Sequence, residues 1–145
     1  MVIDGFPGHL SRLLLGVGDS DGRLRARPAA EVWSPVEYMA HTGDAIAWYA
    51  GRIARVLNED RPALHPFDWD AHTAAQRYRE RRLTDVLATV RGSCASLAAE
   101  LGAVTAWERE GIGSDGTPRT VAQLADRAAH EARHHLRDIE LGLDR

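Results

Sequence analysis

The stretch DRPALHPFDWDAHTAAQRYRERR, residues 60–82, decides the fold, because it connects the second and third of four predicted helices. Its first half, through Asp70, contains two prolines and is typical of a loop. Residues 71–81 are predicted to form a short helix. Short connections in a bundle join antiparallel neighbours, whereas a connection of this length can cross the bundle. We therefore expect the second and third helices to run parallel.

The helices themselves are predicted from apolar residues spaced three and four apart and from capping signals. Ser34 begins one helix, with proline next and Glu37 three positions on, which is a capping box. Thr120 and Gln123 form a second capping box. The four predicted helices cover residues 5–18, 34–59, 83–101 and 120–143. No strand pattern is evident, so residues 1–145 are predicted to form a single all-α domain, a four-helix bundle.

Composition narrows the class of protein. The net charge is −3, and the basic residues, all arginine, are spread along the chain, which argues against nucleic-acid binding. No apolar run approaches the roughly 18 residues of a membrane-spanning helix, and the start of the chain lacks the pattern of a signal peptide. The single cysteine, Cys94, excludes an internal disulfide and a thiolate metal cluster. We therefore expect a cytoplasmic protein without nucleic-acid or membrane partners.

Candidate site residues are concentrated in the segment HEARHH that begins at His130 in the last helix. Residues four apart share a helix face, so His130 pairs with His134, and Glu131 pairs with His135. Imidazole nitrogens and carboxylate oxygens are common ligands of divalent metals, and either pair could supply two of them. On a helical wheel Glu131 and His135 fall at the edge of the apolar stripe, while the other pair falls on the solvent side.

Asp138 continues the inward row of Glu131 and His135 on the same wheel. A purely structural role, without a metal, is also open at this point, because Glu131 and His135 could simply form an intrahelical hydrogen bond. His41, on the second helix, could likewise be a core histidine. A glutamate that is buried without a partner costs free energy, so the position of Glu131 requires one.

Most of the chain, from about Trp33 to Leu143, resembles the DinB-like superfamily, in particular its small actinobacterial members. The matching segments are VEYMAHTGDA at 36–45, RVLNEDRPAL at 55–64, FDWDAHTAAQRYRE at 67–80 and GIGSDGTPRTVAQLADRAAHEARHHLRDIELG at 111–142. The resemblance implies a four-helix bundle whose second and third helices run parallel, in agreement with the crossover.

The resemblance also implies a metal site. Many members bind a divalent metal through three histidines, one on the second helix in an H-x-x-D context and two, four apart, on the last helix. His41 and Asp44 match the first motif, and His135, with Asp138 three positions on, matches the last histidine. Glu131 occupies the position where the common pattern has histidine. The expected ligands are therefore His41, Glu131 and His135, with Asp44 and Asp138 as carboxylates that orient them.

For activity, the resemblance implies a metal-dependent transferase or isomerase that uses a low-molecular-weight thiol on a small-molecule substrate; in actinobacteria that thiol would be mycothiol. The metal stays open among zinc, nickel, iron and manganese. The candidates for the pocket are Trp48, His65, Trp69 and His72. The alternatives are a metal-free bundle that binds a small ligand or partner, which Glu131 favours, and a specialised enzyme of secondary metabolism. A homodimer is compatible with each.

Overall fold

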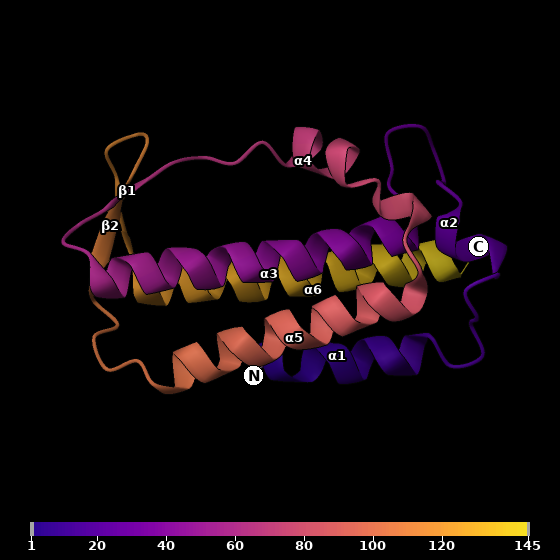
Figure 1. Cartoon of the computed structure of the whole chain (residues 1–145), viewed down its shortest axis with the longest axis horizontal. Coiled ribbons are helices and arrows are strands. Elements are labelled where there is room, and N and C mark those ends of the chain that lie inside the picture. Colours follow the sequence, from indigo (N-terminus) through magenta and orange to yellow (C-terminus); the bar gives the residue numbers. More distant parts are fainter. Residues whose placement is uncertain (1, 145) are drawn as a thin grey trace.

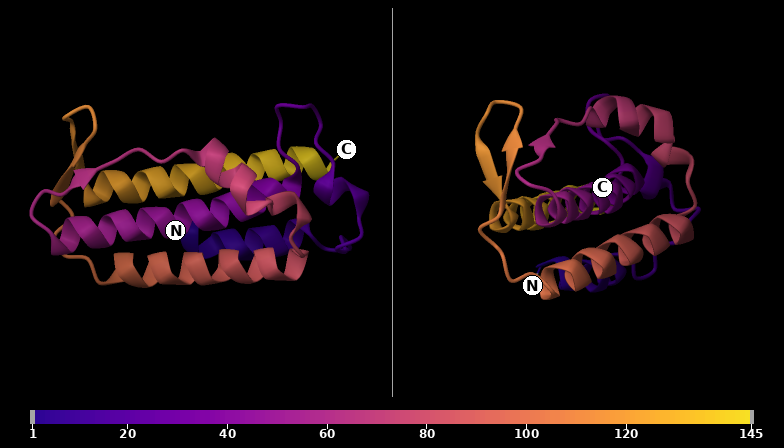
Figure 2. Two further views of the ribbon diagram at one scale, coloured as in Figure 1. Left: turned by 45° about the horizontal axis from the view of Figure 1, so that its top comes forward. Right: turned by 60° about the vertical axis from the view of Figure 1, so that its left-hand side comes forward.

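The computed structural model describes residues 2–144, and its main feature is a bundle of four long helices (Figures 1 and 2). The long helices are α1 (Val2–Leu13), α3 (Pro35–Asn58), α5 (Leu83–Gly102) and α6 (Val121–Leu143). α3 and α5 run parallel, and α1 and α6 run the opposite way (Figure 1). α3 packs most extensively against α5 and α6. The expected four-helix bundle with a long crossover is confirmed.

The crossover from α3 to α5 passes along the outside of the bundle (Figure 1). It contains β1 (Ala63–Leu64), α4 (Trp69–Gln76) and a 3-10 turn, η1 (Tyr78–Glu80). The helix predicted over residues 71–81 therefore starts earlier and is interrupted at Arg77. The φ angle of Arg77 is 51°, in the left-handed region, so the chain turns there and continues as the 3-10 turn.

Asp44 on α3 fixes the end of the crossover. Its carboxylate accepts a hydrogen bond from the Tyr78 hydroxyl, and the same oxygen lies 3.1 Å from His72 Nε2. Tyr78 is only 1% exposed, and both burial and the hydrogen bond to Asp44 raise the pKa of its hydroxyl. These contacts anchor α4 and η1 against the first half of α3.

A small sheet lies beside the bundle, where the sequence analysis expects no strand. It adds β2 (Glu110–Gly113) and β3 (Pro118–Thr120) to β1, in the order β1-β2-β3. β1 pairs parallel with β2, and β2 pairs antiparallel with β3. Strands of two to four residues are too short to show an alternating pattern. At Gly111 a Cβ atom would lie 2.8 Å from the Leu64 side chain, so glycine allows the two segments to approach.

The N-terminal region differs from the sequence prediction at two places. α1 ends at Leu13 rather than at residue 18, and Gly16 follows with a φ of 77°, the left-handed conformation that commonly follows a helix. A short helix, α2 (Gly22–Arg25), forms in the connection between the first two predicted helices, and the Asp21 side chain caps it by accepting from Arg23 N. Neither change alters the bundle.

The start of α3 is stabilised by a group of polar residues that we call the Glu37 cluster: Arg27, Ser34 and Glu37. Glu37 Oε1 accepts from the Ser34 backbone nitrogen at 3.1 Å, the contact expected of the capping box, and from the Ser34 hydroxyl at 2.8 Å. Arg27 donates to both carboxylate oxygens, at 2.9 and 2.6 Å. The Glu37 side chain is only 3% exposed, so these bonds replace its hydration.

The core lies between the apolar faces of the four long helices. Gly43 on α3 lets α5 approach closely, because a Cβ atom there would lie 3.3 Å from the Val90 side chain. Cys94 is part of this core, and burial, with a smaller effect from Asp4, raises the pKa of its thiol to about 11. Within residues 2–144, no helix combines the length and the apolar character needed to cross a membrane.

Candidate metal centre

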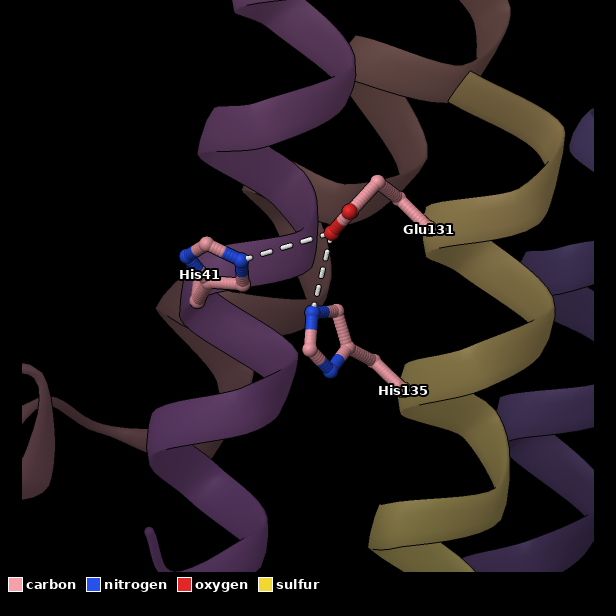
Figure 3. A group of neighbouring side chains, drawn as sticks. All are labelled: His41, Glu131 and His135. Atoms are coloured by element: carbon pink, nitrogen blue, oxygen red, sulfur yellow. Dashed lines mark hydrogen bonds and ion pairs between the residues drawn. The ribbon is translucent and has the colours of Figure 1, made fainter. Parts of the chain in front are cut away.

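α3 and α6 bring together His41, Glu131 and His135, which we call the His/Glu cluster (Figure 3). Glu131 Oε2 lies 3.0 Å from His135 Nε2 and 3.8 Å from His41 Nε2. One ligand atom from each residue lies within 4.8 Å of the other two. The carboxylate thus lies between two imidazole nitrogens that come from different helices.

The other pair on α6, His130 and His134, points away from the bundle. Both residues are exposed, and their rings stack on each other at a centroid distance of 6.0 Å. The helical wheel predicts this orientation, because one residue of difference turns a side chain by about 100° around the helix. The His134 ring lies 5.4 Å from the His135 ring and its Nε2 lies 3.8 Å from Asp138, but neither His130 nor His134 belongs to the His/Glu cluster.

Hydrogen bonds hold the His135 ring between two carboxylates. Its Nδ1 lies 3.1 Å from Asp138 Oδ2, and its Nε2 lies 3.0 Å from Glu131 Oε2. Burial lowers the pKa of His135, but the two carboxylates outweigh burial and raise that pKa above its usual value. The hydrogen bond with His135, and secondarily the proximity of His41, keeps the pKa of Glu131 well below its usual range.

His41 provides a test of whether the cluster fits a metal ion. The residue is 5% exposed, its Nδ1 has no hydrogen-bond partner, and its Nε2 is too far from Glu131 for a hydrogen bond. Within the described residues neither ring nitrogen of His41 has a hydrogen-bond partner, and coordination of a cation would give Nε2 a partner while Nδ1 would stay without one. An ion about 2.1 Å from two ligands keeps them roughly 3.0–3.4 Å apart at octahedral or tetrahedral angles. The cluster therefore fits a divalent ion once its ligand atoms, which lie up to 4.8 Å apart, draw together by about 1.4 Å.

Aromatic rings surround the His/Glu cluster. Trp33 and Trp69 contact the His41 ring at centroid distances of 5.0 and 4.8 Å, and Tyr38 stacks on His135 at 5.3 Å. Such rings limit the access of water and strengthen electrostatic interactions within the cluster. Trp33 could not be placed at the site from sequence alone, because it precedes α3 and belongs to no periodic pattern.

A cavity of about 740 Å³ adjoins the cluster, with Glu131 in its wall. Of the predicted pocket residues, Trp48 and Trp69 line this cavity. His65 and His72 lie outside its lining: the His65 carbonyl accepts from Arg52, and His72 contacts Asp44. Sequence reasoning missed the contributions of the β2–β3 hairpin and of the first turns of α6, which supply Gly113, Ser114, Asp115, Arg119, Gln123, Leu124, Asp126 and Arg127.

The two carboxylates expected to orient the ligands lie in different surroundings. Asp138 contacts the outer nitrogen of His135, an arrangement that fixes which nitrogen faces the cluster. Asp44 binds Tyr78 and His72 instead, and the His41 ring has no contact with it at hydrogen-bond distance among the described residues. In this structure Asp44 therefore anchors the crossover rather than the His41 ring.

Comparison with known proteins agrees with this fold. The chain belongs to the DinB superfamily, whose family model matches residues 4–139. Among solved structures it is similar to YfiT from Bacillus subtilis, described as a probable metal-dependent hydrolase with an unusual four-helix bundle topology. The TM-score is 0.84 at 20% sequence identity, covering 97% of this chain and 81% of YfiT. No curated protein matches the sequence.

Proposed function

We propose that the protein is a divalent-metal-dependent enzyme that acts on a small molecule, with His41, Glu131 and His135 as the metal ligands. The observation that supports this most is the convergence of one ligand atom each from His41, Glu131 and His135, within 4.8 Å of one another. Membership of the DinB superfamily and the description of YfiT as metal-dependent point the same way.

The protein's own residues prepare the cluster for a cation. Asp138 holds the outer nitrogen of His135, so that Nε2 faces Glu131 and His41. The aromatic rings of Trp33 and Trp69 restrict water around His41, and Glu131 connects the cluster to the cavity. Two imidazoles and one carboxylate suit zinc, iron, manganese or nickel.

A divalent ion held by three protein ligands supplies Lewis-acid chemistry, because it lowers the pKa of a thiol or water and polarises a carbonyl group. With a low-molecular-weight thiol as the nucleophile the reaction is thiol transfer or isomerisation, which we propose first. With water it is hydrolysis, the activity in the description of YfiT.

The test begins with the metal content of protein purified without chelator. We expect near-stoichiometric metal, and conjugation of monochlorobimane to mycothiol that a chelator abolishes and added metal restores. Metal-dependent hydrolysis of a p-nitrophenyl ester without thiol would instead identify the hydrolase. Protein that neither retains nor rebinds zinc, nickel, iron or manganese would refute the proposal and favour a metal-free bundle.

A further inference from the structure

The cavity beside the His/Glu cluster combines aromatic walls with arginine side chains. Trp48, Phe67 and Trp69 form one apolar part of its lining. Phe67 remains 39% exposed although it is large and apolar, and its ring lies 4.6 Å from the Trp69 ring. Exposed aromatic side chains gathered at a cavity are typical of a surface that contacts a ligand.

Arg52 is a half-buried cation on this wall. Its guanidinium lies 4.0 Å above the Trp48 ring and donates to the His65 carbonyl. The pKa of Arg52 is lowered, mainly by burial. In the part of the chain that the structure describes, no carboxylate forms an ion pair with Arg52. Charges withdrawn from water are normally paired, so this position favours an external anion.

Two arginines of the cavity wall have no carboxylate partner within residues 2–144. Asp115 is already paired with Arg119, at 3.6 Å, and Glu131 belongs to the His/Glu cluster. Arg127, one helical turn before Glu131 on α6, forms no ion pair within residues 2–144. Asp126 is the remaining acidic residue of the lining and is exposed. The wall holds three arginines and three carboxylates in all, and Arg52 and Arg127 are its two cations without a carboxylate partner among the described residues.

The helix positions give the length of a matching ligand. Arg52 follows His41 by eleven positions on α3, which is about 16 Å along the helix axis. Arg127 precedes Glu131 by four positions on α6, or about 6 Å. Because α3 and α6 run in opposite directions, both arginines are displaced from the cluster toward the β2–β3 hairpin (Figure 1). A ligand that reaches them from the cluster is elongated.

We infer that the cavity binds an elongated small molecule with an aromatic body and an oxyanion, a carboxylate or a phosphate, held by Arg52 and Arg127. The aromatic body packs on Trp48, Phe67 and Trp69. The assignment of its reactive end to the His/Glu cluster rests on the proposed function. The oxyanion subsite depends only on the residues of the cavity, because arginine forks bind both carboxylates and phosphates.

The experiment is calorimetric titration with three probes: naphthalene-2-carboxylate, 2-naphthyl phosphate and the uncharged naphthalene-2-carboxamide. We expect at least one anion to bind about tenfold or more tightly than the carboxamide, and the stronger anion identifies the source of the oxyanion. Arg52→Gln and Arg127→Gln should each weaken that anion about tenfold and leave the carboxamide unchanged. Arg91→Gln, which removes an exposed arginine of α5 outside the cavity, is the charge-matched control.

Each further outcome supports or overturns the inference. Equal weakening by Arg91→Gln, equal affinity for the carboxamide, or no binding at millimolar probe would overturn it. Arg52→Gln also removes a contact with the His65 carbonyl. Arg127→Gln therefore tests the oxyanion subsite without changing that contact. The titrations are repeated on chelator-treated protein and on the His135→Ala variant. If the metal-free protein still prefers the anion to the carboxamide, the oxyanion subsite is supported even when the metal proposal fails. If the preference requires metal and is unchanged in Arg52→Gln and Arg127→Gln, the oxyanion subsite is overturned.

Discussion

Glu37, which is buried, and Glu131, which is partly buried, are two carboxylates of the bundle with different surroundings. Glu37 is 3% exposed, and both of its oxygens accept hydrogen bonds from Arg27, with Ser34 adding two more. The contacts of Glu131 are all at Oε2, which faces two histidines, and its side chain reaches the wall of a cavity. The first carboxylate has every oxygen matched by donors and is structural. The second faces the Nε2 atoms of two histidines with a single oxygen, an arrangement that suits a cation.

The largest expected effect comes from removing a ligand of the His/Glu cluster. His135→Ala should lower the affinity for Zn²⁺ by more than about 100-fold, beyond the range found when an outer partner is removed. His130→Ala, on the solvent-facing side of α6 and outside the cluster, is the matched control and should bind as the wild type does. Competition with a chromophoric chelator measures both. Equal affinities in the two variants would contradict the ligand assignment.

A smaller loss is expected when the partner of a ligand is changed. Asp138→Asn keeps the size of the side chain but weakens the acceptor that fixes His135 Nδ1. The affinity for Zn²⁺ should fall by about 10–100-fold with little change in stability. Asp85→Asn, which changes an exposed carboxylate of α5 outside the cavity, is the control. A variant that binds the metal as the wild type does would leave Asp138 without a positioning role.

The Glu37 cluster should respond in the opposite way, with a change in stability and none in metal binding. Glu37→Gln removes the charge that accepts from Arg27 and Ser34, and hydrogen bonds to charged groups contribute about 1.5–3 kcal/mol. The free energy of unfolding in urea should fall by about that amount. If metal affinity fell instead, the separation between the two carboxylates would be wrong.

The contribution of Glu37 to the free energy of unfolding should also depend on pH. Burial raises the pKa of Glu37, but hydrogen bonds from Arg27 and Ser34 outweigh it and keep that pKa below its usual value. A carboxyl whose pKa is lowered by folding contributes stability above the ordinary glutamate pKa of about 4.3, and this contribution is lost as the pH falls through the folded value. The difference in unfolding free energy between wild type and Glu37→Gln should therefore be greatest near neutral pH and shrink below about pH 4. A constant difference would be inconsistent with a lowered pKa.

The smallest expected effect concerns the choice of metal. Glu131→His restores the common family pattern and replaces a carboxylate oxygen by an imidazole nitrogen. Binding should persist, while the ratio of Ni²⁺ to Mn²⁺ affinity rises, because imidazole suits nickel and carboxylate suits manganese. Competition titrations with the two ions measure the ratio. An unchanged ratio would indicate that position 131 does not contact the ion.

Much of the bundle could be predicted from the sequence because long helices repeat their signals. The start of α3 follows from Ser34 and Glu37, and the inward orientation of Glu131 and His135 follows from the apolar stripe of α6. The three short strands gave no signal, since Ala63–Leu64 is too short for a period and Glu110–Gly113 contains two glycines. Arg77, which interrupts the predicted crossover helix, has no sequence signature for its left-handed conformation.

The candidate site was predictable where it depends on one helix and unpredictable where it depends on tertiary contacts. The pairing of Glu131 with His135 is a property of spacing on α6, whereas its proximity to His41 followed only from the family resemblance. The partners of Asp44 come from a segment with no periodicity, so Tyr78 and His72 could not be assigned to it. The β2–β3 hairpin contributes to the cavity only because the sheet brings it there.

The crossover also has a consequence for how the chain folds. Because α3 and α5 are parallel, they cannot associate as a local helical hairpin, and the connection must first span the bundle (Figure 1). α3 also packs on α6, which lies at the far end of the sequence, and β1 pairs with β2 although the whole of α5 separates them in the sequence. Contacts between residues distant in sequence slow folding, since loop-closure entropy is lost before they form. The protein should therefore fold more slowly than an up-and-down bundle of equal length and stability.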